Sequence, residues 1–210
     1  MGRPINADAA ATRQRILESA TVLFAEQGAK SSIREIAKGA GVSLAMVHHY
    51  FGSKDELYGS CVDAMYVELA ELREHLAKEL ATARGTNVFE KAVREGFRFA
   101  RAHQSAMRLM LRRVVARGAL DEGRAEEFLV PFLDQASAIV ASLTGRSASA
   151  LRLPLQSLVF LNGRYAIADA EELKLVTGAA TERDALAAVE DHLVEHAYLM
   201  LGLPRPSEEA

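Results

Sequence analysis

The sequence predicts an all-α protein of about nine helices, in which an N-terminal module of three helices precedes a larger helical domain. Two observations support this fold class. Apolar residues recur every three or four positions through almost the whole chain, which is the period of a helix, and no long segment alternates at the period of a strand. Glycines and hydroxyl residues interrupt the pattern at intervals, as helix ends and starts do. The 210 residues, half of them hydrophobic, are enough for a small module and a second core.

The first two expected helices lie near the N-terminus. One covers residues 8–27 and ends at Gly28, because glycine readily terminates a helix. The next begins after Ser32, since Ser32 and Glu35 have the spacing of a capping box, in which each side chain bonds the other residue's backbone N–H. It ends around Gly41.

The remaining helices follow with similar signals. Ser43 can cap a short helix over residues 44–50, and Ser53 can cap a long one over 54–83. Further helical patterns cover residues 87–103, 105–117, 122–144, 151–170 and 182–201.

Two prolines fall within these patterns. Pro154 is expected in the first turn of the helix over residues 151–170, where proline is tolerated. Pro131 lies inside the pattern over 122–144, so that segment is either kinked or begins near Pro131.

Several classes of protein are excluded by composition. No run of about twenty apolar residues is present, so we expect no membrane span. The first fifteen residues are polar, which argues against a secretory signal. The single cysteine, Cys61, cannot form an internal disulfide, and this favours a cytoplasmic location.

Charge is distributed unevenly along the chain. Residues 1–54 hold seven lysines and arginines against four acidic residues, a net +3, so the other 156 residues carry −6 of the total of −3. A basic end on an acidic body is the asymmetry expected when one end contacts a polyanion.

The most informative segment is residues 33–57. Two short helices joined by a glycine-bearing turn form the helix-turn-helix arrangement. The second helix is capped by a hydroxyl, and its N-terminal amides and small residues suit close approach to a DNA backbone and major groove. Val47 and Phe51 are expected to face inward. A DNA-binding domain over residues 1–53 is therefore predicted.

This segment resembles the DNA-binding domain of the tetracycline-repressor (TetR) family. The pattern is matched across residues 10–60, about a quarter of the chain, and departs from the family at Ala45-Met46 and at His48, which are reading positions. The matching residues are Phe24, Gly28, Ile33, Ile36, Ala37, Ala40, Gly41, Val42, Ser43, Tyr50, Phe51, Ser53, Lys54 and Leu57.

The resemblance implies a set of DNA-contacting residues. Those facing DNA would be Ser43, Leu44, Ala45, Met46, His48, His49 and Tyr50, and those on phosphates Ser32 and Lys54.

Each assignment has a simpler alternative. Ser32 and Ser43 can serve as helix caps alone, Met46 can belong to the core, Tyr50 can pack inward, and Lys54 can be an ordinary solvated lysine. We expect no metal at His48 and His49, because adjacent helical residues point in different directions.

The larger part of the chain resembles the family in architecture only. By that resemblance, residues 54–203 form an effector-binding and dimerisation domain, followed by a frayed tail over 204–210. The helices over 151–170 and 182–201 would pair with those of a second copy, and two heads would then bind one operator. The apolar stripe expected to form that interface on the second helix comprises Leu186, Val189, Leu193, Ala197 and Met200. The alternative is packing within one chain.

A small-molecule effector is expected among the middle helices, where methionine and aromatic side chains suit an adaptable apolar pocket. The same side chains can instead be ordinary core. Arg101, Arg108 and Arg112 are interpreted as a solvated face. The candidate effector residues are Phe97, His103, Met107, Met110, Phe128, Phe132, Asn162 and Tyr165.

The function implied is that of a ligand-responsive regulator, most simply a repressor that binds a palindromic DNA operator as a homodimer. Activation is the alternative, as is a helical adaptor that does not bind DNA. An enzyme is not expected, because the sequence has no glycine-rich phosphate loop, no Cys/His cluster and no nucleophile-turn motif. We expect neither a cofactor nor a membrane partner.

Overall fold

The computed structural model describes residues 5–82, 87–118 and 122–203, and the predicted tail over 204–210 lies outside them. These residues form helices and contain no strand, which confirms the all-α class. The chain divides into two compact units, one made of residues 1–68 and 105–118 and the other of 69–104 and 119–210. These units are defined by packing, whereas the predicted boundary between 53 and 54 is functional and stays a prediction.

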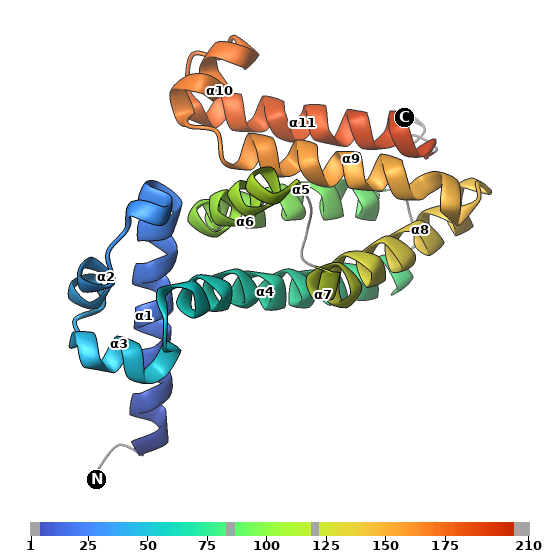
Figure 1. The fold of residues 1–210 in the computed structure, drawn as a ribbon. Helices are drawn as coiled ribbons and strands as arrows, with labels where there is room; N and C mark the ends of the chain where they lie inside the picture. Colours follow the sequence, from blue (N-terminus) through green and yellow to red (C-terminus); the bar gives the residue numbers. More distant parts are fainter. Residues whose placement is uncertain (1–4, 83–86, 119–121, 204–210) are drawn as a thin grey trace. The chain divides into compact units, whose positions relative to one another are not determined.

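The first unit holds the N-terminal helices, the beginning of α4, and α6 without its first residue. In Figure 1, α2 and α3 lie beside α1. The side chains of Ile16, Phe24, Ile36, Val47, Leu57 and Leu109 are almost fully buried and form its core. Its elements are α1 (Ile5–Gln27), a 3₁₀ turn (Gly28–Lys30), α2 (Ile33–Ala40), α3 (Leu44–Phe51), α4 (Lys54–Thr82) and α6 (Gln104–Arg117).

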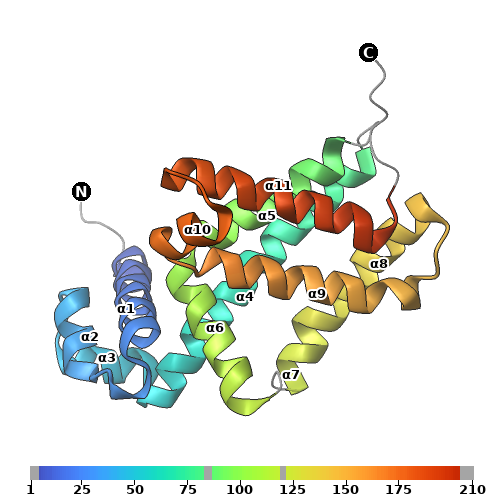
Figure 2. The same ribbon diagram turned by 90° about the horizontal axis from the view of Figure 1, so that it is seen from above.

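The second unit is a helical bundle that includes the end of α4. α9 and α11 lie side by side in Figures 1 and 2, and both contact α5. Its core gathers Leu133, Val140, Leu151, Leu155, Val194, Tyr198 and Leu201. Its other elements are α5 (Asn87–Ala102), α7 (Glu122–Arg124), a π-helical turn (Ala125–Leu129), α8 (Val130–Thr144), α9 (Ala148–Ala166), α10 (Ala170–Thr177) and α11 (Glu182–Leu201).

Two details of this bundle differ from expectation. α9 begins at Ala148 because the Ser147 hydroxyl accepts a hydrogen bond from the Ala150 N–H, so Pro154 lies inside the helix and not in its first turn. α9 also ends at Ala166, and a short helix that was not predicted, α10, begins after Asp169, which caps it through the Glu172 N–H at 2.8 Å. Pro131 does not start a separate helix: the backbone is helical from α7 through the π-helical turn Ala125–Leu129 into α8, so the segment is a helix interrupted by a π-helical turn just before Pro131.

Candidate nucleic-acid interface

The helix that precedes the turn, α2, is fixed at both ends by local hydrogen bonds. The predicted capping box is present: Ser32 Oγ accepts from the Glu35 N–H at 3.3 Å, and Glu35 Oε2 accepts from the Ser32 N–H at 3.1 Å. α2 ends at Gly41, whose φ of +66° is a left-handed conformation that favours glycine. The Val42 N–H then donates to Ala37 O at 3.0 Å, which closes the end of α2 and sets the direction of α3.

α3 buries one side and exposes the other. Val47 and Phe51 are 1% and 6% exposed, and the guanidinium of Arg13 on α1 lies 5.0 Å from the centre of the Phe51 ring. Because a helix turns once every 3.6 residues, Ala45 and His49 lie opposite this buried pair. The predicted inward positions are thus confirmed.

The exposed side of α3 gathers the residues that the sequence assigned to DNA. Tyr50 is half-buried, with its ring in edge contact with that of His49 at 5.3 Å. Met46 is 37% exposed, which excludes the alternative that it belongs to the core. The exposed members of the set are Ser43, Leu44, Ala45, Met46, His48 and His49.

Two of the acidic residues that flank α3 in sequence, Glu35 and Glu56, are engaged in helix capping. Glu35 belongs to the box described above, and Glu56 forms a second one, in which Ser53 donates its N–H to Glu56 Oε2 at 2.7 Å and accepts from the Glu56 N–H at 3.2 Å. These bonds to Ser53 hold the pKa of Glu56 below its ordinary value. Lys54, half-buried, is the first residue of α4. Two basic side chains on α2, those of Arg34 and Lys38, are exposed.

His48 closes the end of α3. Its Nδ1 lies 2.8 Å from the carbonyl oxygen of Gly52, and the Gly52 N–H donates to the carbonyl oxygen of His48 at 2.9 Å. Side chain and backbone of one residue are therefore both bonded to Gly52. Sequence reasoning missed this contact, although a histidine four residues before a glycine at a helix end is a usable signal.

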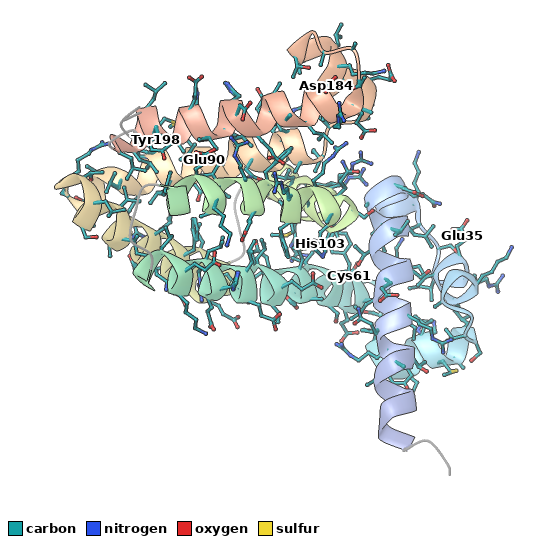
Figure 3. The ribbon with its side chains drawn as sticks, turned by 180° about the vertical axis from the view of Figure 1, so that it is seen from behind. Glu35, Cys61, Glu90, His103, Asp184 and Tyr198 are labelled. Atoms are coloured by element: carbon teal, nitrogen blue, oxygen red, sulfur yellow. The ribbon has the colours of Figure 1, made fainter. Side chains whose placement is uncertain are left out.

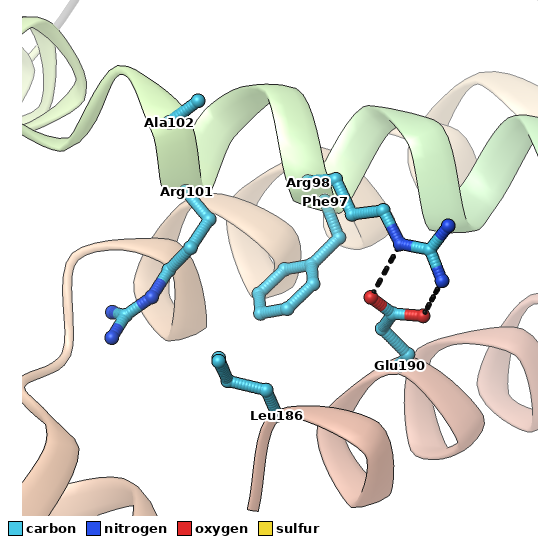
Figure 4. Close-up of a pocket in the computed structure, with 6 residues that line it drawn as sticks. All are labelled: Phe97, Arg98, Arg101, Ala102, Leu186 and Glu190. Carbon is cyan, nitrogen blue, oxygen red and sulfur yellow. Dashed lines mark hydrogen bonds and ion pairs between the residues drawn. The ribbon is translucent and has the colours of Figure 1, made fainter. Parts of the chain in front are cut away.

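The candidate effector residues are divided between the two units. Met107 and Met110 belong to the first unit, and the other six belong to the second. Phe97, 1% exposed, lines a hollow of about 310 Å³ together with Arg98, Arg101, Ala102, Leu186 and Glu190 (Figure 4). Of the predicted set, this hollow contains Phe97 only.

The remaining candidates of the second unit have other neighbours. Phe132 packs against the core of the bundle. The Tyr165 ring meets the His192 ring edge-on at 5.9 Å, and His103 Nδ1 lies 2.8 Å from Phe99 O. Asn162 and Phe128 are half-buried.

An ion-pair network beside the hollow was not predicted. Glu190, 9% exposed, accepts from Arg98 Nε at 2.8 Å and Nη2 at 2.7 Å (Figure 4). It also accepts from Arg94 Nη1 at 3.4 Å. The hydrogen bonds that Arg98 donates to Glu190 raise the pKa of Arg98. The available signal was a carboxylate inside the apolar pattern of residues 185–194.

The interpretation of the arginine row as a solvated face was wrong at Arg101, whose side chain is 18% exposed, whereas Arg112 is exposed as expected and also makes a contact that was not predicted. Arg101 Nη1 donates to the carbonyl oxygens of Ala166 and Ala168, and Arg112 Nη1 donates to Phe24 O at 3.2 Å. The last carbonyl groups of a helix lack partners within the helix. Here arginines that are distant in sequence donate hydrogen bonds to them, which sequence spacing does not reveal.

The prediction that the α11 stripe forms the dimer interface is wrong for three of its five residues, while Leu186 and Met200 are half-buried. Val189, Leu193 and Ala197 are at most 2% exposed within one chain, so they pack inside the subunit and cannot contact a second copy. The apolar side chains left exposed on α9 and α11 are Leu153, Val159, Phe160 and Leu199.

One group of residues has the spacing of metal ligands. Ligand atoms of His75, Glu79 and Glu95 lie within 4.8 Å of one another. The ammonium of Lys91, however, is 2.7 Å from Glu79 Oε1 and 3.5 Å from Glu95 Oε1. A cationic side chain already neutralises these carboxylates, which makes the group an ion-pair cluster between α4 and α5.

No individual helix in the part of the chain that the structure describes is long and apolar enough to cross a membrane. One bent pair, Ala125–Thr144 with Ala148–Ala166, passes the same test of length and composition.

These features define a helical protein with a helix-turn-helix module near its N-terminus. Residues 16–61, which include the helix-turn-helix module, match the family described as bacterial regulatory proteins, tetR family. The chain is 38% identical over 87 residues to the HTH-type transcriptional repressor Rv3405c of Mycobacterium tuberculosis, over 39% of this chain and 46% of that protein. The chain thus spans about half the length of the curated relatives that it matches.

Solved structures share the whole fold. A TetR-like transcriptional regulator from Rhodococcus sp. RHA1 has a TM-score of 0.67 and 19% identity, over 96% of this chain and 98% of that one. NalD, the secondary repressor of the MexAB-OprM multidrug efflux pump in Pseudomonas aeruginosa, has a TM-score of 0.55 and 18% identity, over 94% of this chain and 98% of that one. At these identities the likeness concerns the fold.

Proposed function

We propose that this chain is a transcriptional repressor that binds a palindromic DNA operator as a homodimer and is released by a small-molecule effector. The observation that carries the proposal is the exposed surface of α3. Its inner side is held by Val47 and Phe51, while Ala45, Met46 and His49 face outward on a helix short enough to enter a major groove.

The proposed DNA contacts divide into two kinds. Ser32 and Lys54, at the starts of α2 and α4, would hold phosphates, since helix N-termini attract anions. The residues from Ser43 to Tyr50, apart from the buried Val47, would face the groove. Phosphate contacts position the protein, and groove contacts specify the sequence.

Binding to a duplex is the direct test. A duplex selected from a random pool by the full-length protein is titrated by fluorescence anisotropy against a scrambled duplex. We expect preference for the selected duplex and a slope of log K against log salt of about −0.9 for each phosphate neutralised. Ala45→Glu should abolish the preference, because it places a carboxylate at the outermost point of α3. Ala138→Glu, on an exposed position of α8, is the matched control. Equal affinity for both duplexes would contradict the proposal.

The proposed dimer uses the outer sides of α9 and α11. Leu153 is 75% exposed, Leu199 68% and Phe160 45%, and such large apolar side chains are costly to leave in water. A second copy of the chain would cover them through a symmetric interface.

The oligomeric state tests this interface. By light scattering after gel filtration, we expect the full chain to be a dimer and Phe160→Asp or Leu199→Asp to be a monomer. Leu175→Asp, on α10 and 83% exposed, is the matched control and should remain dimeric. A monomeric wild type, or a dimer unaffected by either substitution, would exclude this interface.

The proposed effector binds in the second unit. The supporting observation is the hollow beside Phe97, with an apolar floor of Phe97 and Leu186 between two arginines. His103, Phe128, Phe132, Asn162 and Tyr165 are the other candidates from this unit. Native mass spectrometry of the purified protein should show the mass of a retained small molecule, and adding that molecule should weaken binding to the selected duplex. Phe97→Ala should reduce both effects.

A further inference from the structure

The contact between His48 and Gly52 fixes where the imidazole carries its hydrogen. His48 Nδ1 is 2.8 Å from the Gly52 carbonyl oxygen, and a carbonyl oxygen can only accept a hydrogen bond. Nδ1 must therefore be the protonated nitrogen. A neutral imidazole has one N–H, so its Nε2 is then an acceptor.

This tautomer restricts what a neutral His48 can contact. Phosphate oxygens are acceptors, as are O6 and N7 of guanine, and none of them can bond to a nitrogen that lacks hydrogen. In the major groove, the donors are the exocyclic amino groups at N4 of cytosine and N6 of adenine. A ring that presents only an acceptor is complementary to these two groups.

We propose that His48 is a specificity-determining residue whose Nε2 accepts a hydrogen bond from the exocyclic amino group of a cytosine or an adenine in the operator. The inference rests on the proposed function, because it requires that α3 enters the major groove. His48 is one of the positions at which this sequence departs from the family pattern.

Gly52 is the positioning residue for this contact. It accepts from Nδ1 and donates its N–H to His48 O at 2.9 Å, so the ring and the end of α3 are held together. Its φ is +67°, and a β-carbon there would lie 2.5 Å from Glu56 Oε2. A side chain at position 52 would therefore disturb both the backbone and the capping box that follows it.

The tautomer is tested without DNA. Long-range ¹H–¹⁵N NMR spectra of the ¹⁵N-histidine-labelled full chain at pH 8 should show Nδ1–H signals, one of which disappears in His48→Ala. His103, whose Nδ1 lies 2.8 Å from Phe99 O, provides an internal reference for the same tautomer. Loss of an Nε2–H signal in His48→Ala would overturn the assignment.

The base contact is tested with nucleobase analogues at the same pH. In the selected duplex, each adenine is replaced in turn by purine and each cytosine by 2-pyrimidinone, which removes only the amino group. At one position in each half-site, we expect wild-type affinity to fall by roughly two- to tenfold, the effect of one hydrogen bond. His48→Ala should bind the natural and modified duplexes equally at that position.

Two controls complete the design: a variant of the neighbouring histidine, and a nucleobase analogue that lacks an acceptor instead of a donor. His49→Ala should keep the amino-group dependence, whatever its effect on overall affinity. Replacing guanine by 7-deazaguanine removes an acceptor, and a His48-dependent loss from that change would overturn the proposal. So would identical amino-group dependence in wild type and His48→Ala. Failure of the wild type to select any duplex would instead refute the proposed function.

Discussion

Nη1 of Arg112 lies 3.2 Å from the carbonyl oxygen of Phe24 and 2.4 Å from the point where a β-carbon on Gly28 would lie. The Arg112 guanidinium on α6 therefore contacts the end of α1 at a position where any β-carbon would force that guanidinium to shift. The φ of Gly28, +59°, is a left-handed conformation that also favours glycine.

Substitutions at these two residues should be non-additive. Gly28→Ala costs about 1–2 kcal/mol from the left-handed conformation alone and also displaces Arg112, which loses a hydrogen bond of about 1 kcal/mol. In an Arg112→Ala background, that second loss has already occurred. A double-mutant cycle by urea unfolding should give a coupling of about 1 kcal/mol, and strict additivity would contradict the contact.

The helix cap at Ser32 and its proposed phosphate contact can be separated by charge. Ser32→Asp keeps a good helix cap but places an anion beside a phosphate, so stability should be retained while DNA affinity falls. Ser32→Ala should instead lose about 1 kcal/mol of stability. Ser147→Asp, at the start of α9, is the control that keeps its cap and leaves DNA binding unchanged. If Ser32→Asp binds DNA as the wild type does, Ser32 is only a cap.

Removing Arg98 alone should destabilise the fold more than removing both Arg98 and Glu190. Glu190 is buried while the Arg98 side chain is 64% exposed, so Arg98→Ala leaves a buried carboxylate with only the longer contact to Arg94. We expect a loss of about 1–3 kcal/mol in the free energy of unfolding. Arg98→Ala with Glu190→Leu should recover most of it, because no buried charge remains. A double variant less stable than Arg98→Ala would refute this account.

Cys61 should be unreactive in the folded chain (Figure 3). Burial raises the pKa of its thiol from 9.0 to about 11, opposed by a hydrogen bond from Thr21. Because the folded state holds this proton more tightly, the associated stability is complete below pH 9 and is lost as pH rises toward 11. Comparing urea midpoints of wild type and Cys61→Ala at pH 8 and pH 10 isolates this loss. Rapid native labelling by a disulfide reagent at pH 8 would contradict the burial.

The sequence predicted well those features that depend on neighbours along the chain. The Ser32–Glu35 box, the cap at Ser43 and the inward Val47 and Phe51 were all identified, since caps and helical period are local signals. The start of α9 was misplaced because Pro154 was given more weight than Ser147 as a start signal, and α10 was missed although Asp169 and Glu172 have cap spacing.

What could not be predicted depends on long-range packing. The stripe containing Val189 and Leu193 was identified as apolar, but its period does not reveal whether the same chain or another covers it. The contacts of Arg101 and Arg112 with backbone carbonyls join residues 65 and 88 positions apart, and no local pattern encodes them. The roles of the α3 side chains toward DNA stay predictions.

The burial of Val189, Leu193 and Ala197 within one subunit separates folding from association. Each newly made polypeptide can complete its own bundle alone, and the proposed dimer would then draw only on side chains that are already at the surface. If only the proposed dimer binds the operator, the concentration of dimer at low expression varies with the square of the monomer concentration. A modest change in the rate of synthesis would then give a larger relative change in operator occupancy.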